Sequence, residues 1–183
     1  LGDVYKRQFH ISPVTARLMR NRDLTTIEEM QRYLYGSLSD LYDPHLLKDA
    51  DKGAEIIKEK IEAGKKIRII SDYDVDGVSS NYILYQGLKR CGADVDYKIP
   101  DRVEDGYGIN EHLIEQAAED GIDTIITCDN GIAASAQIAY GNSLGLTIVV
   151  TDHHDIPFQK ENDEITYLPV SYTHLRAHET LMN

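Results

Sequence analysis

The sequence lacks three features, each of which would point to a particular class of protein. Its apolar runs extend over only a few residues, far short of the roughly 20 that a membrane-spanning helix needs, so we expect no membrane partner. Its two cysteines, Cys91 and Cys128, are too few for a disulfide framework, which favours a reducing compartment and a cytoplasmic location. It has no charged-then-apolar leader ending in small residues, so we do not expect secretion.

Basic residues are also scarce. The chain has 19 lysines and arginines against 31 acidic residues, and its formal net charge is −12. Because phosphate contacts favour a basic surface, this balance is unusual for a nucleic-acid enzyme. Carboxylates that bind cations would explain part of the excess. The remainder indicates either a small substrate or a DNA-binding surface on another segment.

Length and composition otherwise fit a packed protein of one domain, or one domain with part of another. The 183 residues are 42% hydrophobic and 27% charged. Residues 1–8 and 169–183 share no pattern with the rest, and we expect them to be a non-native leader and a non-native tail. His174 and His178 are four residues apart and would share one face of a helix, but no third metal ligand lies near them in the sequence.

Residues 9–63 have the pattern of a helical segment. Ser12-Pro13 predicts a helix start, and that helix is expected to end near Arg22. Thr26 followed by Glu29 predicts a capping box at the start of a second helix. Ile56, Ile57 and Ile61 form the apolar stripe of a third helix, which is expected to end at Gly64. No chemistry is visible in this segment.

Residues 64–168 alternate between strand and helix patterns and predict the main domain. Strands are expected at 67–71, 94–99, 123–128 and 146–151, with helices near 77–90, from Asn110, and near 132–143. Such alternation predicts an α/β fold, a doubly wound and mostly parallel sheet with helices on both faces. In these folds ligands bind at the carboxyl ends of the strands.

The richest motif follows the first of these strands. In Ser71-Asp72-Tyr73-Asp74-Val75-Asp76-Gly77, three carboxylates alternate and would repel one another without a cation. The spacing also fits the start of an EF-hand loop, but that loop needs a preceding helix and a Glu at its twelfth position, which is Ile83 here. A solvated acidic turn remains the other alternative. Carboxylates with imidazole suit Mn²⁺ or Mg²⁺, so we expect a metal-dependent phosphoesterase.

Two further strands end in polar motifs. Asp129-Asn130-Gly131 would be an ordinary turn if it stood alone. It is a candidate for the site only because it directly follows a predicted buried strand. Asp152 is expected to fix a histidine tautomer. His153 and His154 are expected to point to opposite sides of an extended segment and to have different roles, with structural histidines as the alternative. Cys128 is expected to be an inert buried thiol.

The loop after the second strand, residues 99–110, carries two candidate substrate contacts. Arg102 has a guanidinium suited to a phosphate. Tyr107, between two glycines, could stack on a base or sugar. The alternative is a surface loop with an Arg–Glu ion pair.

These motifs together resemble the DHH phosphoesterase superfamily. The resemblance is carried by residues 72–80, by Asp129-Asn130-Gly131-Ile132 and by Asp152-His153-His154. The first motif, with Ile99-Pro100-Asp101-Arg102 and residues 106–109, resembles the RecJ family of 5′→3′ exonucleases specific for single-stranded DNA. The likeness extends over residues 9 to about 167. The family's fourth motif, with a further Asp, and its carboxy-terminal domains would lie beyond that point.

The resemblance implies a site and a set of partners. Asp74, Asp76, Asp129 and His153 would ligate two Mn²⁺ or Mg²⁺ ions, and Asp72 would be a ligand or a close support. His154 and Arg102 would contact the substrate phosphate, with Tyr107 beside them. The implied partners are single-stranded DNA, a single-strand-binding protein and a helicase. Two alternatives stay open: a phosphoesterase for short oligonucleotides, cyclic dinucleotides or pyrophosphate, and a non-catalytic replication scaffold.

Overall fold

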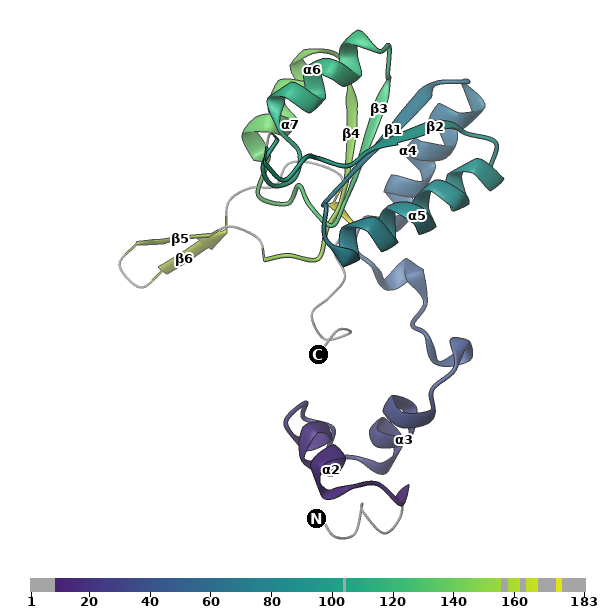
Figure 1. The fold of residues 1–183 in the computed structure, drawn as a ribbon, viewed down its shortest axis with the longest axis vertical. Helices are drawn as coiled ribbons and strands as arrows, with labels where there is room; N and C mark the ends of the chain where they lie inside the picture. The colour runs from purple at the N-terminus through teal and green to yellow at the C-terminus, as the bar shows by residue number, and fades with distance from the viewer. Residues whose placement is uncertain (1–8, 104, 156–157, 162–163, 168–173, 176–183) are drawn as a thin grey trace. The chain divides into compact units, whose positions relative to one another are not determined.

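The computed structural model of the chain describes residues 9–103, 105–155, 158–161, 164–167 and 174–175 (Figure 1). It divides into two compact units, one over Leu1–Asp43 and the other over Pro44–Met182. Each unit is described by itself below. No helix in the described parts of the chain is long and apolar enough to cross a membrane.

The first unit is helical, as predicted, and its helix starts follow local rules. Helix α2 (Pro13–Arg20) begins after Ser12, whose Oγ accepts a hydrogen bond from the Thr15 amide at 3.1 Å. Helix α3 (Ile27–Tyr35) begins with the predicted capping box: Thr26 Oγ1 accepts from the Glu29 amide, and the Glu29 carboxylate accepts from the Thr26 amide. A short 3₁₀ helix, η1 (Leu38–Asp40), follows.

The second unit holds a parallel sheet. Its elements are η2 (Pro44–Leu46), α4 (Ala50–Glu62), β1 (Lys66–Ser71), α5 (Val75–Arg90), β2 (Asp94–Lys98), α6 (Glu111–Glu119), β3 (Thr124–Cys128), α7 (Ser135–Ser143), β4 (Thr147–Thr151), β5 (Phe158–Glu161), β6 (Glu164–Tyr167) and β7 (His174–Leu175). The main sheet has the order β2-β1-β3-β4-β7, and every pairing in it is parallel. The four predicted strands and the predicted fold class are confirmed.

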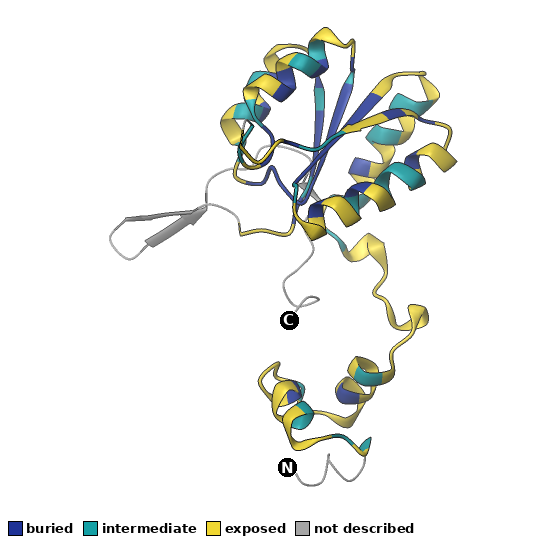
Figure 2. Cartoon of the chain, in the orientation of Figure 1, coloured by how far each residue is buried: buried dark blue, intermediate teal, exposed yellow. Residues whose placement is uncertain are grey.

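Two helix layers cover the sheet because its strands are apolar on both faces. Ile67 and Ile69 of β1 pack with Leu88 of α5 and with the partly buried isoleucines of α4. Ile70, which points to the opposite face, packs with α6 and α7 residues such as Ile114. Figure 1 shows α4 and α5 on one side of the sheet and α6 and α7 on the other, and Figure 2 shows the strands as the most buried part.

The strand order reverses between β1 and β3. From β1 the chain crosses to β2 on one side, and it then returns to place β3 on the other side of β1. At such a reversal the loops leave the two carboxyl ends in opposite directions and open a crevice between them. The crevice lies beyond Ser71 and Cys128, which are paired in the sheet register.

The chain after β4 adds elements that the sequence had not predicted. Strands β5 and β6 pair with each other in an antiparallel hairpin, and β7 pairs with the edge of β4. His174 therefore lies in a strand and not in a helix, while His178 lies outside the described residues. The assignment of 1–8 and 169–183 as non-native sequence stays a prediction, because the structure describes only residues 174–175 of these two ranges.

Candidate metal centre

Three strand ends bring the predicted site residues together. Asp72 directly follows β1, Asp129 directly follows β3, and His153 comes two residues after β4. The register aligns Ser71 with Cys128, and Cys128 with Thr151. Parallel strands with aligned ends deliver the next residues of each strand to one edge, so the predicted convergence is confirmed.

Among the described residues, two sets of three side chains are close enough to hold a metal ion. One set is Asp72, Asp74 and Asp129, and the other is Asp129, His153 and His154; within each set the potential ligand atoms lie within 4.8 Å of one another. Asp129 belongs to both sets. Asp76, also predicted as a ligand, belongs to neither set and lies exposed in the first turn of α5.

Asp74 has a second role that the sequence analysis did not assign to it. It is the N-cap of α5, where its Oδ1 accepts hydrogen bonds from the amides of Asp76 at 2.9 Å and Gly77 at 3.0 Å. These bonds, first that from Gly77, lower the pKa of Asp74 and keep it ionised. The helix therefore starts at Val75, two residues before the predicted start.

Gly77 allows α5 to start this close to β1. A Cβ at this position would lie 2.3 Å from the carbonyl oxygen of Asp72, a distance that no side chain can occupy. The glycine thus lets the first turn of α5 pack against the end of β1. This packing keeps Asp72 and Asp74 at the same edge of the sheet.

Asp129 is buried and unusually placed. Its backbone has a φ of 61°, in the left-handed region that few residues other than glycine adopt. Its side chain is 6% exposed, and His153 Nε2 lies 2.9 Å from its Oδ1. That contact has the distance of an ion pair without hydrogen-bond geometry. Burial, followed by the negative charge of Asp74, raises the pKa of Asp129, and the nearby histidines only partly oppose this effect.

The donor atoms at this edge fit a divalent cation. In the described part of the chain, only Asp72 Oδ1 and Asp129 Oδ1 are buried side-chain polar atoms without a hydrogen bond. A buried oxygen without a partner costs about 1–3 kcal/mol, and a cation would remove that cost. The EF-hand alternative is excluded, because strand β1 and not a helix precedes the motif.

The two histidines do not point to opposite sides, so that prediction is wrong. Their ring centroids are 4.7 Å apart. The reason is that the chain is no longer extended here: Asp152 Oδ1 accepts hydrogen bonds from the amides of both His153, at 2.7 Å, and His154, at 3.1 Å. This turn brings the rings side by side. They still face different partners, since His153 contacts Asp129 and His154 approaches Tyr107.

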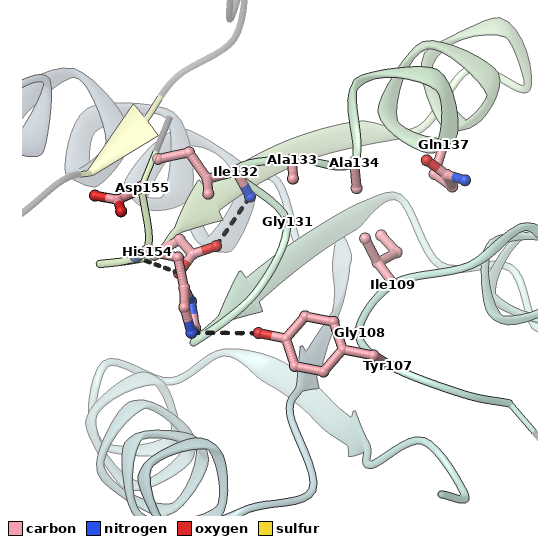
Figure 3. Close-up of a pocket in the computed structure, with 11 residues that line it drawn as sticks. Tyr107, Gly108, Ile109, Gly131, Ile132, Ala133, Ala134, Gln137, His154 and Asp155 are labelled. Atoms are coloured by element: carbon pink, nitrogen blue, oxygen red, sulfur yellow. Dashed lines mark hydrogen bonds and ion pairs between the residues drawn. The ribbon is translucent and has the colours of Figure 1, made fainter. Parts of the chain in front are cut away.

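Asp152 fixes the orientation of His154, as its predicted role requires. Its Oδ1 lies 2.7 Å from His154 Nδ1, and its Oδ2 accepts from the Ile132 amide at 2.9 Å. The bond to Asp152 raises the pKa of His154. It also leaves His154 Nε2 free to face the hydroxyl of Tyr107, 3.4 Å away (Figure 3).

Cavities flank the cluster on both sides. One, of about 540 Å³, is lined by Tyr107, Ile132, Gln137 and His154 among others, and Figure 3 shows the Tyr107 ring at its edge. Burial, with the negative charges of the site carboxylates, raises the pKa of Tyr107 to about 12, so its phenol stays protonated. The other, of about 450 Å³, is lined by residues that include Asp76 and His153.

Cys128 lies in the wall of the second cavity. Burial raises the pKa of its thiol to about 11. A thiol that stays protonated is a poor nucleophile and a poor metal ligand. This agrees with the predicted inert role.

Arg102 and Tyr107, the predicted substrate contacts, are linked by a residue that had no predicted role. The Arg102 guanidinium carbon lies 5.4 Å from the centre of the Tyr73 ring, and Tyr73 meets Tyr107 edge-on with centroids 6.5 Å apart. Arg102 and Tyr107 are both exposed. Glu104, the partner in the surface-loop alternative, lies outside the described residues.

Tyr73 and Asn130 had no predicted role. Tyr73 stood between two candidate ligands, and an aromatic residue in that position carried no separate signal. Asn130 appeared only as part of an Asn-Gly turn, yet its side chain is buried and makes three hydrogen bonds. Two of its three partners, Ile70 and Ile109, are distant in the sequence, so no local pattern could identify it.

The chain is similar to proteins of known family. A family model described as the DHH family, N-terminal domain, matches residues 66–178. The single-stranded-DNA-specific exonuclease RecJ of Bacillus subtilis (strain 168) is 40% identical over 148 residues, which are 81% of this chain and 19% of that protein. RecJ of Escherichia coli (strain K12) is 32% identical over 145 residues, 79% of this chain and 24% of that protein.

A solved structure supports the same relationship. The crystal structure of exonuclease RecJ bound to manganese matches with a TM-score of 0.63 and 32% identity, covering 74% of this chain and 33% of that one. The chain thus spans about a fifth to a quarter of the length of these curated relatives. Because the family model covers more than half of the chain, including β1 to β4 and every ligand candidate described above, this chain belongs to the DHH family.

Proposed function

We propose that this chain supplies the metal-binding part of a hydrolase that removes nucleotides from the 5′ end of single-stranded DNA. The observation that carries the proposal is Asp129, a buried carboxylate shared by two three-residue ligand sets. Its relatives are named as single-stranded-DNA-specific exonucleases, and one of them was solved with manganese. Because the chain spans only part of their length, the activity is proposed for the whole protein.

The proposed ligands are Asp72, Asp74, Asp129 and His153. Asp72 and Asp129 each offer a buried oxygen without a hydrogen bond, and Asp74 has one oxygen left after capping α5. Asp76 is proposed as a further ligand through a change of its side-chain rotamer, since it lines the cavity beside His153. An imidazole among the ligands favours Mn²⁺ over Mg²⁺, which prefers oxygen ligands alone.

Two cations in such a site supply an activated water and neutralise charge on the phosphoryl group. The residues of the chain have the other tasks. Asp129, which belongs to both ligand sets, would contribute a carboxylate oxygen to each. Asp152 accepts a hydrogen bond from Nδ1 of His154 and raises the pKa of that histidine, which favours the imidazolium form, in which Nε2 also carries a proton and would donate to a non-bridging phosphate oxygen.

The exposed residues around the cluster would orient the DNA. The Arg102 guanidinium would pair with a phosphate, and Tyr107 would stack on a base at the edge of the larger cavity. The acidic charge of the chain implies that most backbone contacts come from the remainder of the protein. The single-strand-binding protein and helicase that the family resemblance implies would likewise be partners of the whole protein.

The test uses a chimera in which residues 9–167 replace the matching segment of the Bacillus subtilis relative. We expect Mn²⁺-dependent release of mononucleotides from a 5′-labelled single strand, and we expect Asp74→Ala or Asp129→Ala to abolish it. Asp94→Ala, in the edge strand β2, is the matched control for loss of one carboxylate. Activity that survives either site substitution would refute the proposed mechanism.

Substrate choice is tested in the same assay. A long single strand, a dinucleotide, a cyclic dinucleotide and pyrophosphate are compared at equal concentration. Preference for the long strand supports the exonuclease. Preference for any of the small substrates would move the function to a small-phosphate esterase, and failure to bind Mn²⁺ would favour a non-catalytic scaffold.

A further inference from the structure

Asn130 connects three segments that are far apart in the sequence. Its side chain is 1% exposed. Nδ2 donates to the carbonyl of Ile70 at 3.1 Å and to the carbonyl of Cys128 at 3.0 Å, while Oδ1 accepts from the Ile109 amide at 3.2 Å. Both donors and one acceptor site of the amide are used, and only one orientation of the amide group satisfies all three bonds.

The two carbonyls belong to the strands that deliver the metal ligands. Ile70 lies in β1, two residues before Asp72, and Cys128 is the last residue of β3, directly before Asp129. A single side chain therefore joins the carboxyl ends of both strands. The two carbonyls that it binds lie within two residues of Asp72 and Asp129, which belong to the first ligand set.

The third partner belongs to the loop that carries Tyr107. Gly108 has a φ of +68°, and a Cβ there would lie 3.2 Å from the Cβ of Asn130, so the loop backbone passes directly over Asn130. Other hydrogen bonds of the loop, such as Asn110 Nδ2 to the carbonyl of Asp105 at 3.0 Å, join loop residues to one another. The buried Ile109 side chain also packs in the apolar core, but such packing is non-directional and does not fix the orientation of the loop.

Tyr107 itself has little packing to hold it in place. It is 56% exposed, it meets Tyr73 and His154 edge-on with centroid distances of 6.5 and 6.2 Å, and its hydroxyl makes one long hydrogen bond, of 3.4 Å, with His154 Nε2. Its position relative to the carboxylates must therefore come mainly from its backbone. The hydrogen bond between Asn130 and Ile109 is the directional contact that links this backbone to the ligand-bearing strands.

We propose that Asn130 is a positioning residue that holds the Tyr107 loop at a set distance from the metal-binding carboxylates. Through it, the group that contacts the DNA and the group that binds the metal share one rigid support. The identity of the ligand at Tyr107 rests on the proposed function. The link between the loop and the strands is independent of the proposed function, because it rests on the hydrogen bonds of Asn130.

The test compares Asn130→Ala with Asn81→Ala in this chain. Asn81 is a matched control because it is also buried and donates to Ser71 Oγ at the end of β1, at 2.9 Å, and among the described residues its side chain makes no hydrogen bond to the loop. Hydrogen exchange is measured on peptides covering residues 101–110, β1 and β3. Affinities for Mn²⁺ and for a short single-stranded oligonucleotide in Mn²⁺ are measured in parallel.

We expect Asn130→Ala to speed amide exchange in the 101–110 peptide about tenfold or more. Removing a buried hydrogen bond worth about 1.4 kcal/mol lowers the local stability of the loop by that amount, and a loop that opens more often exchanges faster. Oligonucleotide affinity should fall by a larger factor than Mn²⁺ affinity. Asn81→Ala should leave exchange in the loop unchanged. Unchanged loop exchange in Asn130→Ala, or the same loop effect in Asn81→Ala, overturns the proposal.

A second variant reaches the contact from the opposite side. Gly108→Ala places a methyl group against Asn130 and strains the loop at its positive φ, while leaving the bonds to Ile70 and Cys128 intact. It should loosen the loop in the same way, which keeps the proposal testable if Asn130→Ala does not fold. Because most DNA contacts are assigned to the remainder of the protein, the chimera assay decides the proposed function even if no variant of this chain binds the oligonucleotide, and the exchange result decides the role of Asn130.

Discussion

Replacing Asp129 with Asn should change the stability of the chain in opposite directions with and without metal. In the absence of metal, Asp129 Oδ1 is buried without a hydrogen bond and lies close to Asp74. Burial and the charge of Asp74 disfavour the ionised Asp129 carboxylate more than the contact with His153 Nε2, 2.9 Å away, favours it, so the neutral amide of Asp129→Asn should stabilise the metal-free chain by about 1 kcal/mol. For a chain of this size, that corresponds to a rise in Tm of roughly 2–4 °C per kcal/mol.

The pH dependence of this gain follows from the raised pKa of Asp129. A carboxyl group whose pKa is higher in the folded than in the unfolded state destabilises the fold at every pH above the folded-state pKa. That cost decreases as the pH falls through the folded-state pKa, and it is absent below the unfolded value of about 3.9. The stabilising effect of Asp129→Asn should therefore be largest above the folded-state pKa and should shrink on acidification through it.

Metal should reverse the order. Mn²⁺ at 100 times its dissociation constant stabilises a binding protein by about 2.7 kcal/mol. The wild type should gain this amount, whereas the variant has lost the ligand common to both sets and should gain little. With EDTA the variant should melt at the higher temperature, and with saturating Mn²⁺ the wild type should.

Thermal unfolding followed by circular dichroism, in EDTA and across a Mn²⁺ titration, measures both effects. Asp94→Asn removes one exposed carboxylate from β2 and controls for the change in net charge. A variant that melts at or below the wild-type temperature in EDTA would show that the buried carboxylate carries no cost. An equal Mn²⁺-induced shift in both proteins would show that Asp129 is not a shared ligand.

Four further substitutions test packing and one ion pair in the second unit. Gly77→Ala should destabilise by about 1–3 kcal/mol in denaturant unfolding, because its Cβ would collide with backbone, whereas Gly87→Ala in the same helix has open space and should stabilise by about 0.5–1 kcal/mol. Ile126→Ala in the fully buried part of β3 should cost about 2–5 kcal/mol in the same measurement. Burial acts to raise the pKa of Asp123, but the hydrogen bonds from Lys60 and Thr124 and the charges of Lys60 and Lys65 together outweigh it and lower that pKa. Asp123→Asn should therefore reduce Tm at pH 7, with a difference that shrinks below about pH 4 and is lost as the pH falls through the folded-state pKa. A Tm difference that persists at pH 2 would contradict this assignment.

Local patterns in the sequence predicted most of the secondary structure, because local contacts produce it. Thr26 and Glu29 form their capping box within four residues, and the structure has it. The strands were visible as apolar runs because both faces of the sheet are covered. Helix α5 starts earlier than predicted because Asp74 caps it. The sequence prediction treated Asp74 only as a metal ligand and did not consider it as an N-cap.

The predicted opposition of His153 and His154 failed for a comparable reason. The prediction assumed that the extended backbone of β4 continues through both residues. Asp152 instead accepts hydrogen bonds from both of their amides and turns the chain. A short polar side chain can override strand geometry at the point where the sheet's own hydrogen bonds end.

The sequence by itself determined which residues could bind a metal and at which edge of which kind of sheet they would meet. Carboxylates and imidazoles directly after buried strands were sufficient for that, since parallel strands end at a common edge. Only the tertiary structure decided that Asp129 is shared by both ligand sets, that Tyr73 links Arg102 to Tyr107, and that Asn130 supports the loop. These relations join segments that are far apart in the chain, so their geometry depends on strand order and register, which no local pattern contains.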